Sequence, residues 1–374
     1  FAASSGIDTH SARARFVAQF SAAVEDLRMN IQQALAKVVE GNSLQREEMQ
    51  AVMRQIMSGD ATDAQVGGLL VALRMKGETT EEVAGAAQVM RDLATPVIVS
   101  DPHLVDLVGT GGDGANLFNV STGASFVAAA AGAKVAKHGN RSVSSTSGSS
   151  DVLEKLGMPL GLDPKQVARA ITDVGVGFMF APAHHSAMRH AIGPRKELGI
   201  RTVFNILGPL TNPAGVTRQL IGVFAADLCQ PMAEVLKLLG SEHAMIVHSD
   251  DGLDEISIAA GTSVTELCDG NIETYHISPQ DFSLPLQSLD GLSVNSAAAS
   301  ASLIRSALSG ASDEASKKAG AMLALNAGAT IYVSGIAATL ADGVAMAEDA
   351  LASGLAAEKL KQFVDFTQLM RGHG

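Results

Sequence analysis

The chain has 374 residues, and its 27 lysines and arginines against 39 aspartates and glutamates give it a formal net charge of −12. With 47% hydrophobic and 18% charged residues it can bury a large core, which excludes an intrinsically disordered protein. Only 4% of the residues are aromatic, and an acidic chain with so few stacking side chains is a poor nucleic-acid binder. The length predicts two domains, or one large α/β unit with an appendage.

Residues 1–28 differ from the rest of the chain. They show no clear apolar period and lack the continuous apolar segment of a secretory signal. We interpret them as a leader or an expression remnant, and we take Met29 as the biological start because a clean helical pattern begins there. An organelle transit peptide is the alternative, which Glu25 and Asp26 disfavour.

Residues 29–93 are typical of a small all-α domain. Its helices are separated at residues 41–42 and 59–60, where a glycine precedes a polar residue, and a further helix begins at Thr80, which two glutamates follow. We expect helices from about residues 184–205 to join this domain.

After Pro96 the pattern changes to short apolar strands that alternate with helices, which predicts a parallel sheet covered on both faces. The predicted fold class is therefore α/β, with a small all-α N-terminal domain and a larger α/β domain, residues 97–374, whose mostly parallel central sheet is flanked by helices. We expect strands at residues 103–108, 134–137, 219–224 and 244–248, helices at 121–131 and ending near 240, an antiparallel ribbon between 255 and 277, and Ala-rich helices at the end.

Two features bear on the location of the protein. The uncharged run at residues 319–341 is interrupted by glycines and polar residues, so we expect two buried segments around a turn and no membrane span. Cys229 and Cys268 are too few for a disulfide framework and indicate inert thiols in a reducing compartment. We therefore expect a cytoplasmic protein.

A glycine-rich loop follows the first predicted strand. Gly109, Gly111 and Gly114 match the spacing of a dinucleotide-binding loop. Such a site needs an acidic residue about 20 positions further on, whereas residues 134–150 hold three cations and no acid. A strand that leads into a glycine loop and a helix N-terminus presents backbone N–H groups to an anion. These residues therefore predict a phosphate site and disfavour a nicotinamide nucleotide.

Residues 142–150 are rich in serine, and seven of the nine carry a hydroxyl group. On composition alone, a flexible linker is the alternative. The run lies just after a strand and opposite the glycine loop, and ligands of α/β proteins bind where the carboxyl ends of strands meet. The position therefore favours a ligand-binding loop.

Two polar clusters lie further along the chain. Residues 250–255 carry four acids and are either a Mg²⁺ site or a solvated acidic turn; a nearby phosphate loop favours the metal. Residues 184–201 combine histidines and arginines in a spacing that fits no zinc motif. Most of these side chains suit a surface or hinge, while an arginine fork could bind a planar carboxylate.

These stretches together resemble the anthranilate phosphoribosyltransferase family over nearly all of the chain from Met29. The resemblance is carried by GTGGDGAN (109–116), NVST (119–122), KHGNRSVSS (137–145), SGSSDVLEKLG (147–157), TVFNILGPLTNPA (202–214) and the Asp254-Glu255 pair. It implies a helical domain over an α/β domain, a homodimer made through the helical domain, and transfer of phosphoribosyl from phosphoribosyl pyrophosphate (PRPP) to anthranilate with Mg²⁺, in tryptophan biosynthesis.

The resemblance also implies roles for single residues. Ser121, Asp254 and Glu255 are expected to hold two Mg²⁺ ions, and Asn140 and Arg195 to position anthranilate. Lys137 is expected to act electrostatically, without a covalent nucleophile, since the amine of anthranilate is already neutral and nucleophilic. The expected contacts with PRPP are Gly109, Gly112, Asp113, Asn119, Val120, Ser121, Thr122, Lys137, His138, Gly139, Asn140, Arg141, Ser142, Val143, Ser144, Ser145 and Ser149.

Three positions depart from the family pattern. Leu117 stands where a threonine is usual, Thr146 where a lysine or arginine is frequent, and Met188 near a position where some members have tyrosine. Two alternatives share the expected fold, namely a pyrimidine nucleoside phosphorylase and a nucleic-acid-binding relative without chemistry. The NVST stretch and the acidic pair disfavour the first, and the net negative charge disfavours the second.

Overall fold

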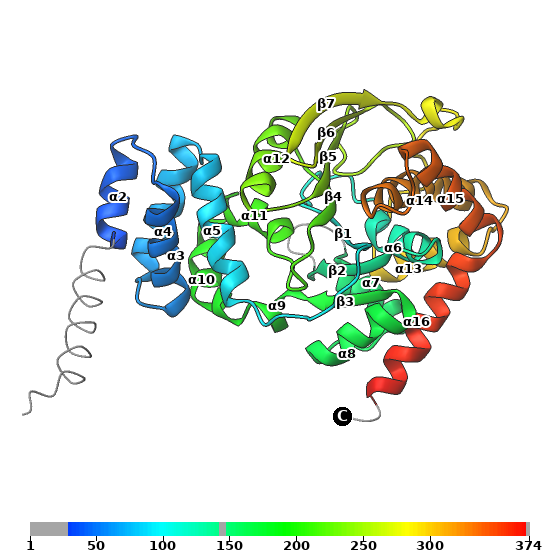
Figure 1. Cartoon of the computed structure of the whole chain (residues 1–374), viewed down its shortest axis with the longest axis horizontal. Helices are drawn as coiled ribbons and strands as arrows, with labels where there is room; N and C mark the ends of the chain where they lie inside the picture. The colour runs from blue at the N-terminus through cyan, green and yellow to red at the C-terminus, as the bar shows by residue number, and fades with distance from the viewer. Residues whose placement is uncertain (1–28, 142–146, 372–374) are drawn as a thin grey trace, which may run out of the picture.

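The computed structural model describes residues 29–141 and 147–371, so the predicted leader lies outside the described residues. The described part has a helical bundle at one end, a twisted sheet in the middle and a second group of helices at the other end (Figure 1). The predicted fold class is confirmed. The bundle consists of α2 (Ile31–Val39), α3 (Arg46–Ser58), α4 (Asp63–Lys76) and α5 (Thr80–Leu93).

Local signals in the sequence set the ends of these helices. Asn30, Thr62 and Thr79 are N-caps whose side chains accept a hydrogen bond from the backbone three residues further on. Gly59 ends α3 in the left-handed conformation, which glycine adopts without strain. The predicted helix breaks at residues 41–42 and 59–60 and the helix start at Thr80 are confirmed. The later helix α10 (Arg189–Leu198) packs against α3 and α4.

A buried ion pair between Lys76 and Glu82 lies inside the helical bundle. The Glu82 carboxylate, which is fully buried, accepts hydrogen bonds from the backbone N–H groups of Leu44 and Thr79 and from Lys76 Nζ at 2.9 Å. Removing one partner of a buried pair leaves the other charge uncompensated.

We expect Glu82→Gln to lower the free energy of unfolding by about 3 kcal/mol, because the Lys76 ammonium would remain buried without its counter-charge. Urea denaturation measures this change. Glu81→Gln is the matched control, since Glu81 pairs with Arg46 on the surface, and its loss should be below about 1 kcal/mol. Equal effects of the two substitutions would contradict the assignment.

The sheet has seven strands in the order β3-β2-β1-β4-β5-β6-β7. The first five are parallel, and β6 and β7 form an antiparallel ribbon at one edge. The predicted strands and ribbon are confirmed, while β3 is an addition to the prediction. The bounds are β1 (Leu104–Gly109), β2 (Lys134–Gly139), β3 (Val176–Phe180), β4 (Arg218–Gly222), β5 (His243–Ser249), β6 (Thr262–Cys268) and β7 (Asn271–Ile277).

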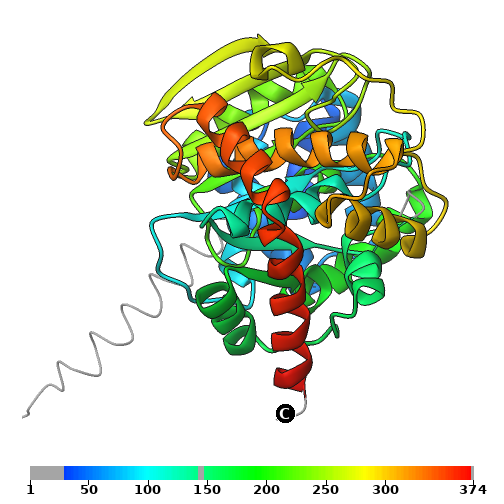
Figure 2. The same cartoon turned by 90° about the vertical axis from the view of Figure 1, so that its right-hand side faces the viewer.

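Helices cover both faces of the sheet, and those near the C-terminus stand in front of it in Figure 2. The uncharged run at residues 319–341 forms the end of α14, a turn and the start of α15. Within the described residues, no helix combines the length and the apolar content of a membrane span. The remaining α-helices are α6 (Val120–Ala130), α7 (Ser149–Leu156), α8 (Pro164–Arg169), α9 (Ala181–His184), α11 (Phe204–Leu207), α12 (Cys229–Leu238), α13 (Ala297–Leu308), α14 (Glu314–Val333), α15 (Leu340–Ala352) and α16 (Leu355–Arg371).

Two large cores hold these layers together. One lies between the sheet and the helices α6, α13, α14, α15 and α16. The other is continuous from the helical bundle through α12 to the opposite face of β4 and β5, where it includes Ile221 and Ile246. Burial of apolar surface therefore fixes the bundle against the side of the sheet, next to the carboxyl ends of its parallel strands.

Candidate active site

The candidate site lies where the chain reverses direction across the sheet. Strand β1 has β2 on one side and β4 on the other, so the loop after β1 starts at the switch point of the parallel strands. Open α/β sheets bind ligands at this place. The strand ends carry glycines at Gly109, Gly139 and Gly222, and the glycine loop follows the first of these.

The glycine loop is shaped by backbone conformations that side chains rarely adopt. Gly111, Gly112 and Gly114 have φ angles of +65°, +84° and +78°. The N–H of Gly111 donates to Asp254 Oδ2 at 2.6 Å. A side chain at Gly109 would collide with the same carboxylate. Glycine at these positions therefore lets the acidic pair approach the loop backbone.

Three carboxylates come together beside this loop. Burial and the neighbouring Asp113 raise the pKa of Asp254 to about 6, and burial together with Asp254 raises the pKa of Glu255 well above its ordinary value. Glu255 Oε1 accepts a hydrogen bond from the N–H of Ser121 at 3.2 Å. The donor set consists of hard oxygens, and a divalent cation would relieve the repulsion between them. The residues present therefore fit Mg²⁺, which Asp254, Glu255 and the Ser121 hydroxyl would hold.

Lys137 is a buried cation beside this group. The residue is 3% exposed, and Nζ donates to the Leu107 carbonyl at 2.7 Å and to Ser121 Oγ at 3.2 Å. Burial lowers the pKa of Lys137, while the charges of Asp106 and Glu255 oppose that change. The ammonium group is thus fixed between β1 and the start of α6, beside the candidate metal ligands.

Asn119 forms hydrogen bonds with two serines that lie far from it in the sequence. Its side-chain Oδ1 accepts from Ser147 Oγ at 2.9 Å and from Ser300 Oγ at 2.8 Å, and its backbone N–H donates to Ser300 Oγ at 2.9 Å. The side chain expected at the diphosphate therefore joins α13 to the serine-rich run. Its neighbours Val120, Ser121 and Thr122 form the first turn of α6.

Four of the expected PRPP contacts lie at the end of β2 or directly after it. His138 and Gly139 end the strand, and Asn140 and Arg141 follow it. A side chain at Gly139 would overlap Ser149 Oγ, so these two residues are in close contact. Arg141 pairs with Asp151 at 2.7 Å and Glu154 at 3.1 Å, so its charge is turned toward α7. Ser142, Val143, Ser144, Ser145 and Thr146 lie outside the described residues.

The histidines and Arg195 lie on the side of the site that faces the helical bundle. The His138 and His185 rings are 5.2 Å apart, and burial is the main cause that lowers the pKa of His138 to about 3. Arg195 belongs to α10 and lies over the Phe204 ring at 5.0 Å. Met188 ends the short helix before α10, and Leu117 forms an isolated bridge with Ser293.

Sequence reasoning missed several residues that build this site. Asp106 in β1 is fully buried, accepts from the His138 N–H at 3.2 Å and from Asn212 Nδ2 at 2.7 Å, and burial raises its pKa to about 6. An acid within an apolar strand was a signal that could have identified it. Ser300 gave no such signal, because it stands in an alanine-rich segment, and Arg201 stood out only as one of the arginines in the cluster at residues 184–201.

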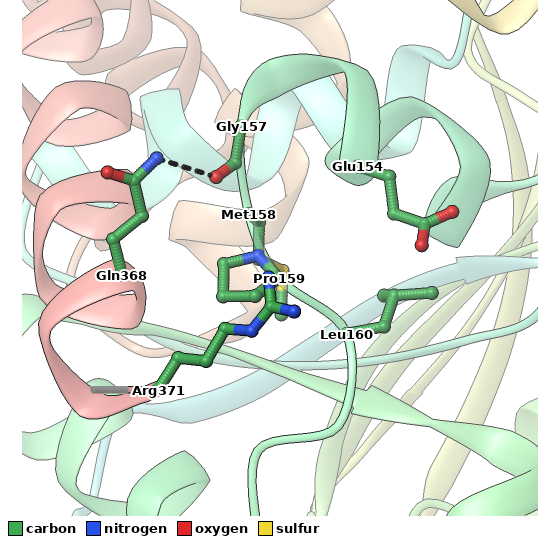
Figure 3. A pocket seen from close by; sticks show the side chains of 7 residues that line it. All are labelled: Glu154, Gly157, Met158, Pro159, Leu160, Gln368 and Arg371. Carbon is green, nitrogen blue, oxygen red and sulfur yellow. Dashed lines mark hydrogen bonds between the residues drawn. The ribbon is translucent and has the colours of Figure 1, made fainter. Parts of the chain in front are cut away.

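Two other features lie apart from the carboxyl ends of the parallel strands. Glu154, Gly157, Met158, Pro159, Leu160, Gln368 and Arg371 line a groove of about 450 Å³ between α7 and α16, which Figure 3 shows. None of them is an expected substrate contact. At the start of β5 and the end of β6, His243, Glu266 and Cys268 converge, but Glu266 already accepts hydrogen bonds from His243, Tyr275 and Tyr332.

The fold and the site together define an α/β protein with a helical bundle, in which the glycine loop suits a phosphate group and the acidic pair suits a divalent cation. Residues 32–94 match the model of the glycosyl transferase family helical bundle domain, and residues 101–357 match that of the a/b domain. An anthranilate phosphoribosyltransferase of Teredinibacter turnerae is 65% identical over 341 residues, which cover 91% of this chain and all of the relative. The chain belongs to the anthranilate phosphoribosyltransferase family.

Solved structures agree with this membership. The anthranilate phosphoribosyltransferase of Thermus thermophilus is 43% identical, with a TM-score of 0.84 over 90% of this chain and 99% of its own. The Saccharomyces cerevisiae enzyme in complex with PRPP and Mg is 28% identical, with a TM-score of 0.81 over 90% of this chain and 98% of its own. The two alternative functions are set aside.

Proposed function

We propose that this chain transfers the 5-phosphoribosyl group of PRPP to the amine of anthranilate and releases pyrophosphate, as a step of tryptophan biosynthesis. The observation that carries the proposal is the meeting of Asp254 with the N–H of Gly111 at 2.6 Å. That contact brings a carboxylate suited to a metal ion next to a glycine loop suited to a phosphate group. Lys137 and Ser121 lie at the same place.

PRPP would bind between the glycine loop and the end of β2. Backbone N–H groups of Gly112 and Asp113 and the first turn of α6 can receive phosphate oxygens, because helix N-termini and glycine loops present unpaired donors. Asp254, Glu255 and Ser121 would hold two Mg²⁺ ions. When bound, these ions would supply positive charge to the leaving diphosphate.

Displacement of pyrophosphate builds positive charge on the ribose and negative charge on the leaving group. The Lys137 ammonium is fixed by its bond to the Leu107 carbonyl and stabilises the negative charge without reorganising. The amine of anthranilate is neutral at pH 7, so no side chain has to form a covalent bond. The chain contributes electrostatic stabilisation and orientation.

Anthranilate would lie toward the helical bundle. Arg195, whose pKa burial lowers, would meet its carboxylate with a planar guanidinium fork, and Asn140 would orient the ring. Residues 29–93 with α10 would form one domain and the rest of residues 97–374 the other, and substrates would enter between them. A homodimer made through the helical domain is part of the proposal, as the family resemblance implies. We place the enzyme in the cytoplasm.

Loss of anthranilate fluorescence on addition of PRPP tests the proposed function. We expect a PRPP-dependent loss with Mg²⁺ and none after the metal is chelated with EDTA. A pyrimidine nucleoside with inorganic phosphate, assayed for release of the free base, is the control for a phosphorylase. An absence of metal-dependent loss with folded protein would overturn the proposed function.

A further inference from the structure

Arg201 connects the glycine loop with the segment that follows α10, two parts of the site that lie far apart in the sequence. It follows α10, which carries Arg195, and its Nη2 donates to the Gly112 carbonyl at 2.6 Å. The guanidinium also lies over the Phe224 ring, 4.0 Å from its centroid. Arg201 is exposed, so it contributes little to either core.

Phe224, which lies under the Arg201 guanidinium, also contacts the glycine loop through its backbone. Its backbone N–H donates to Thr110 Oγ1 at 3.0 Å, and the Thr110 N–H donates to the Gly222 carbonyl at 2.9 Å. The end of β4, the glycine loop and Arg201 therefore form one connected set of contacts. A guanidinium over an aromatic ring is held in orientation by that ring.

The glycine loop needs such support because it is built from residues with the largest conformational freedom. Gly111, Gly112 and Gly114 all lose that freedom when the loop takes its present shape. Asp254 holds the loop at the Gly111 N–H, and Arg201 holds it at the Gly112 carbonyl. In a trans peptide the C=O and the following N–H point in opposite directions, so the bond to Gly112 also sets the direction of the Asp113 N–H.

We infer that Arg201 is a positioning residue that holds the glycine loop in the shape that receives PRPP. The inference rests on the proposed function, which places Gly112 and Asp113 at PRPP. A carbonyl held by a guanidinium is not free to turn toward an anionic ligand. Arg201 also connects the PRPP loop to the segment that carries Arg195, on the anthranilate side.

Steady-state kinetics of Arg201→Ala test this role. We expect the KM for PRPP to rise about tenfold, since one charge-assisted hydrogen bond is lost, while kcat and the KM for anthranilate change less than about threefold. Arg201→Lys keeps a charged donor without the planar fork and should recover part of the loss. A KM for PRPP within about twofold of wild type would overturn the inference, as would an equal rise in both KM values.

Arg169→Ala is the matched control. Arg169 also lies over a phenylalanine, Phe366, at 5.8 Å and pairs with Asp173, but it belongs to α8, away from the strand ends. Its KM for PRPP should not change, and both variants should keep the wild-type melting temperature. A rise in the KM for PRPP with Arg169→Ala as large as with Arg201→Ala would overturn the inference.

Calorimetric binding of PRPP with Mg²⁺, without anthranilate, separates this inference from the proposed function. If the wild type binds PRPP more tightly than Arg201→Ala but shows no turnover, the result would support the positioning role of Arg201 and contradict the proposed reaction. Equal affinities would overturn the role of Arg201 whatever the turnover.

Discussion

Lys137→Met should lower kcat/KM by about a thousandfold, because the substitution removes a preorganised charge from a buried site. Methionine fills a similar volume, so the position stays packed. The Lys137 ammonium touches Ser121 Oγ at 3.2 Å and approaches no exposed surface. Its charge can therefore act only within the site. The measurement is the rate of anthranilate fluorescence loss per folded molecule.

Lys134→Met is the matched control for this prediction. Lys134 belongs to the same strand, but its Nζ donates to the Thr172 carbonyl at 2.9 Å, away from the carboxylates. Activity should stay near that of wild type. Retention of more than a tenth of wild-type activity by Lys137→Met would contradict the electrostatic role of Lys137.

The fold could be predicted largely because its signals are local. Apolar runs bounded by glycine mark β1 and β2, and capping residues such as Thr79 mark helix starts within one residue. Strand β3 was missed because a five-residue apolar run cannot be told from a buried helix segment by periodicity alone.

The candidate site could be predicted only where a motif carries the chemistry. The glycine loop, Lys137 and the acidic pair are recognisable in the sequence and come together in the structure. Ser300 is not recognisable, and the contact of Arg201 with the glycine loop is not either. Both depend on partners, Asn119 and Gly112, that lie 181 and 89 positions away. Such pairings depend on the folded arrangement, which no local pattern records.

The charge balance of the site shows why the acidic composition and the anionic ligand are compatible. The negative charges of Asp106 and Glu255 both raise the pKa of Lys137, and Asp106 has the larger effect. The surplus of negative charge at Asp113, Asp254 and Glu255 is what a divalent cation would neutralise. An overall charge of −12 therefore says little about this site, whose negative charge a bound cation would offset.

The double substitution Asp254→Asn with Glu255→Gln should lower kcat/KM by about a thousandfold at any Mg²⁺ concentration, because the amides no longer attract the ions that offset the diphosphate charge. It should also abolish the Mg²⁺-dependent rise in melting temperature that we expect for the wild type, which thermal unfolding measures. A remaining Mg²⁺-dependent rise would contradict the assignment of these ligands. Asp250→Asn with Asp251→Asn, just before them in the sequence, is the matched control and should leave both readouts near wild type.

The same carboxylates predict how the effect of Mg²⁺ depends on pH. A folded pKa of about 6 for Asp254, raised from 3.8, means that the metal-free folded state binds more protons than the unfolded state between these values. This residue therefore makes the metal-free protein less stable as the pH rises through that window. Mg²⁺ competes with those protons, so its stabilising effect should be larger at pH 7.5 than at pH 5. A Mg²⁺-induced shift in melting temperature that is equal at both pH values would contradict this account, whereas the double variant should show no shift at either.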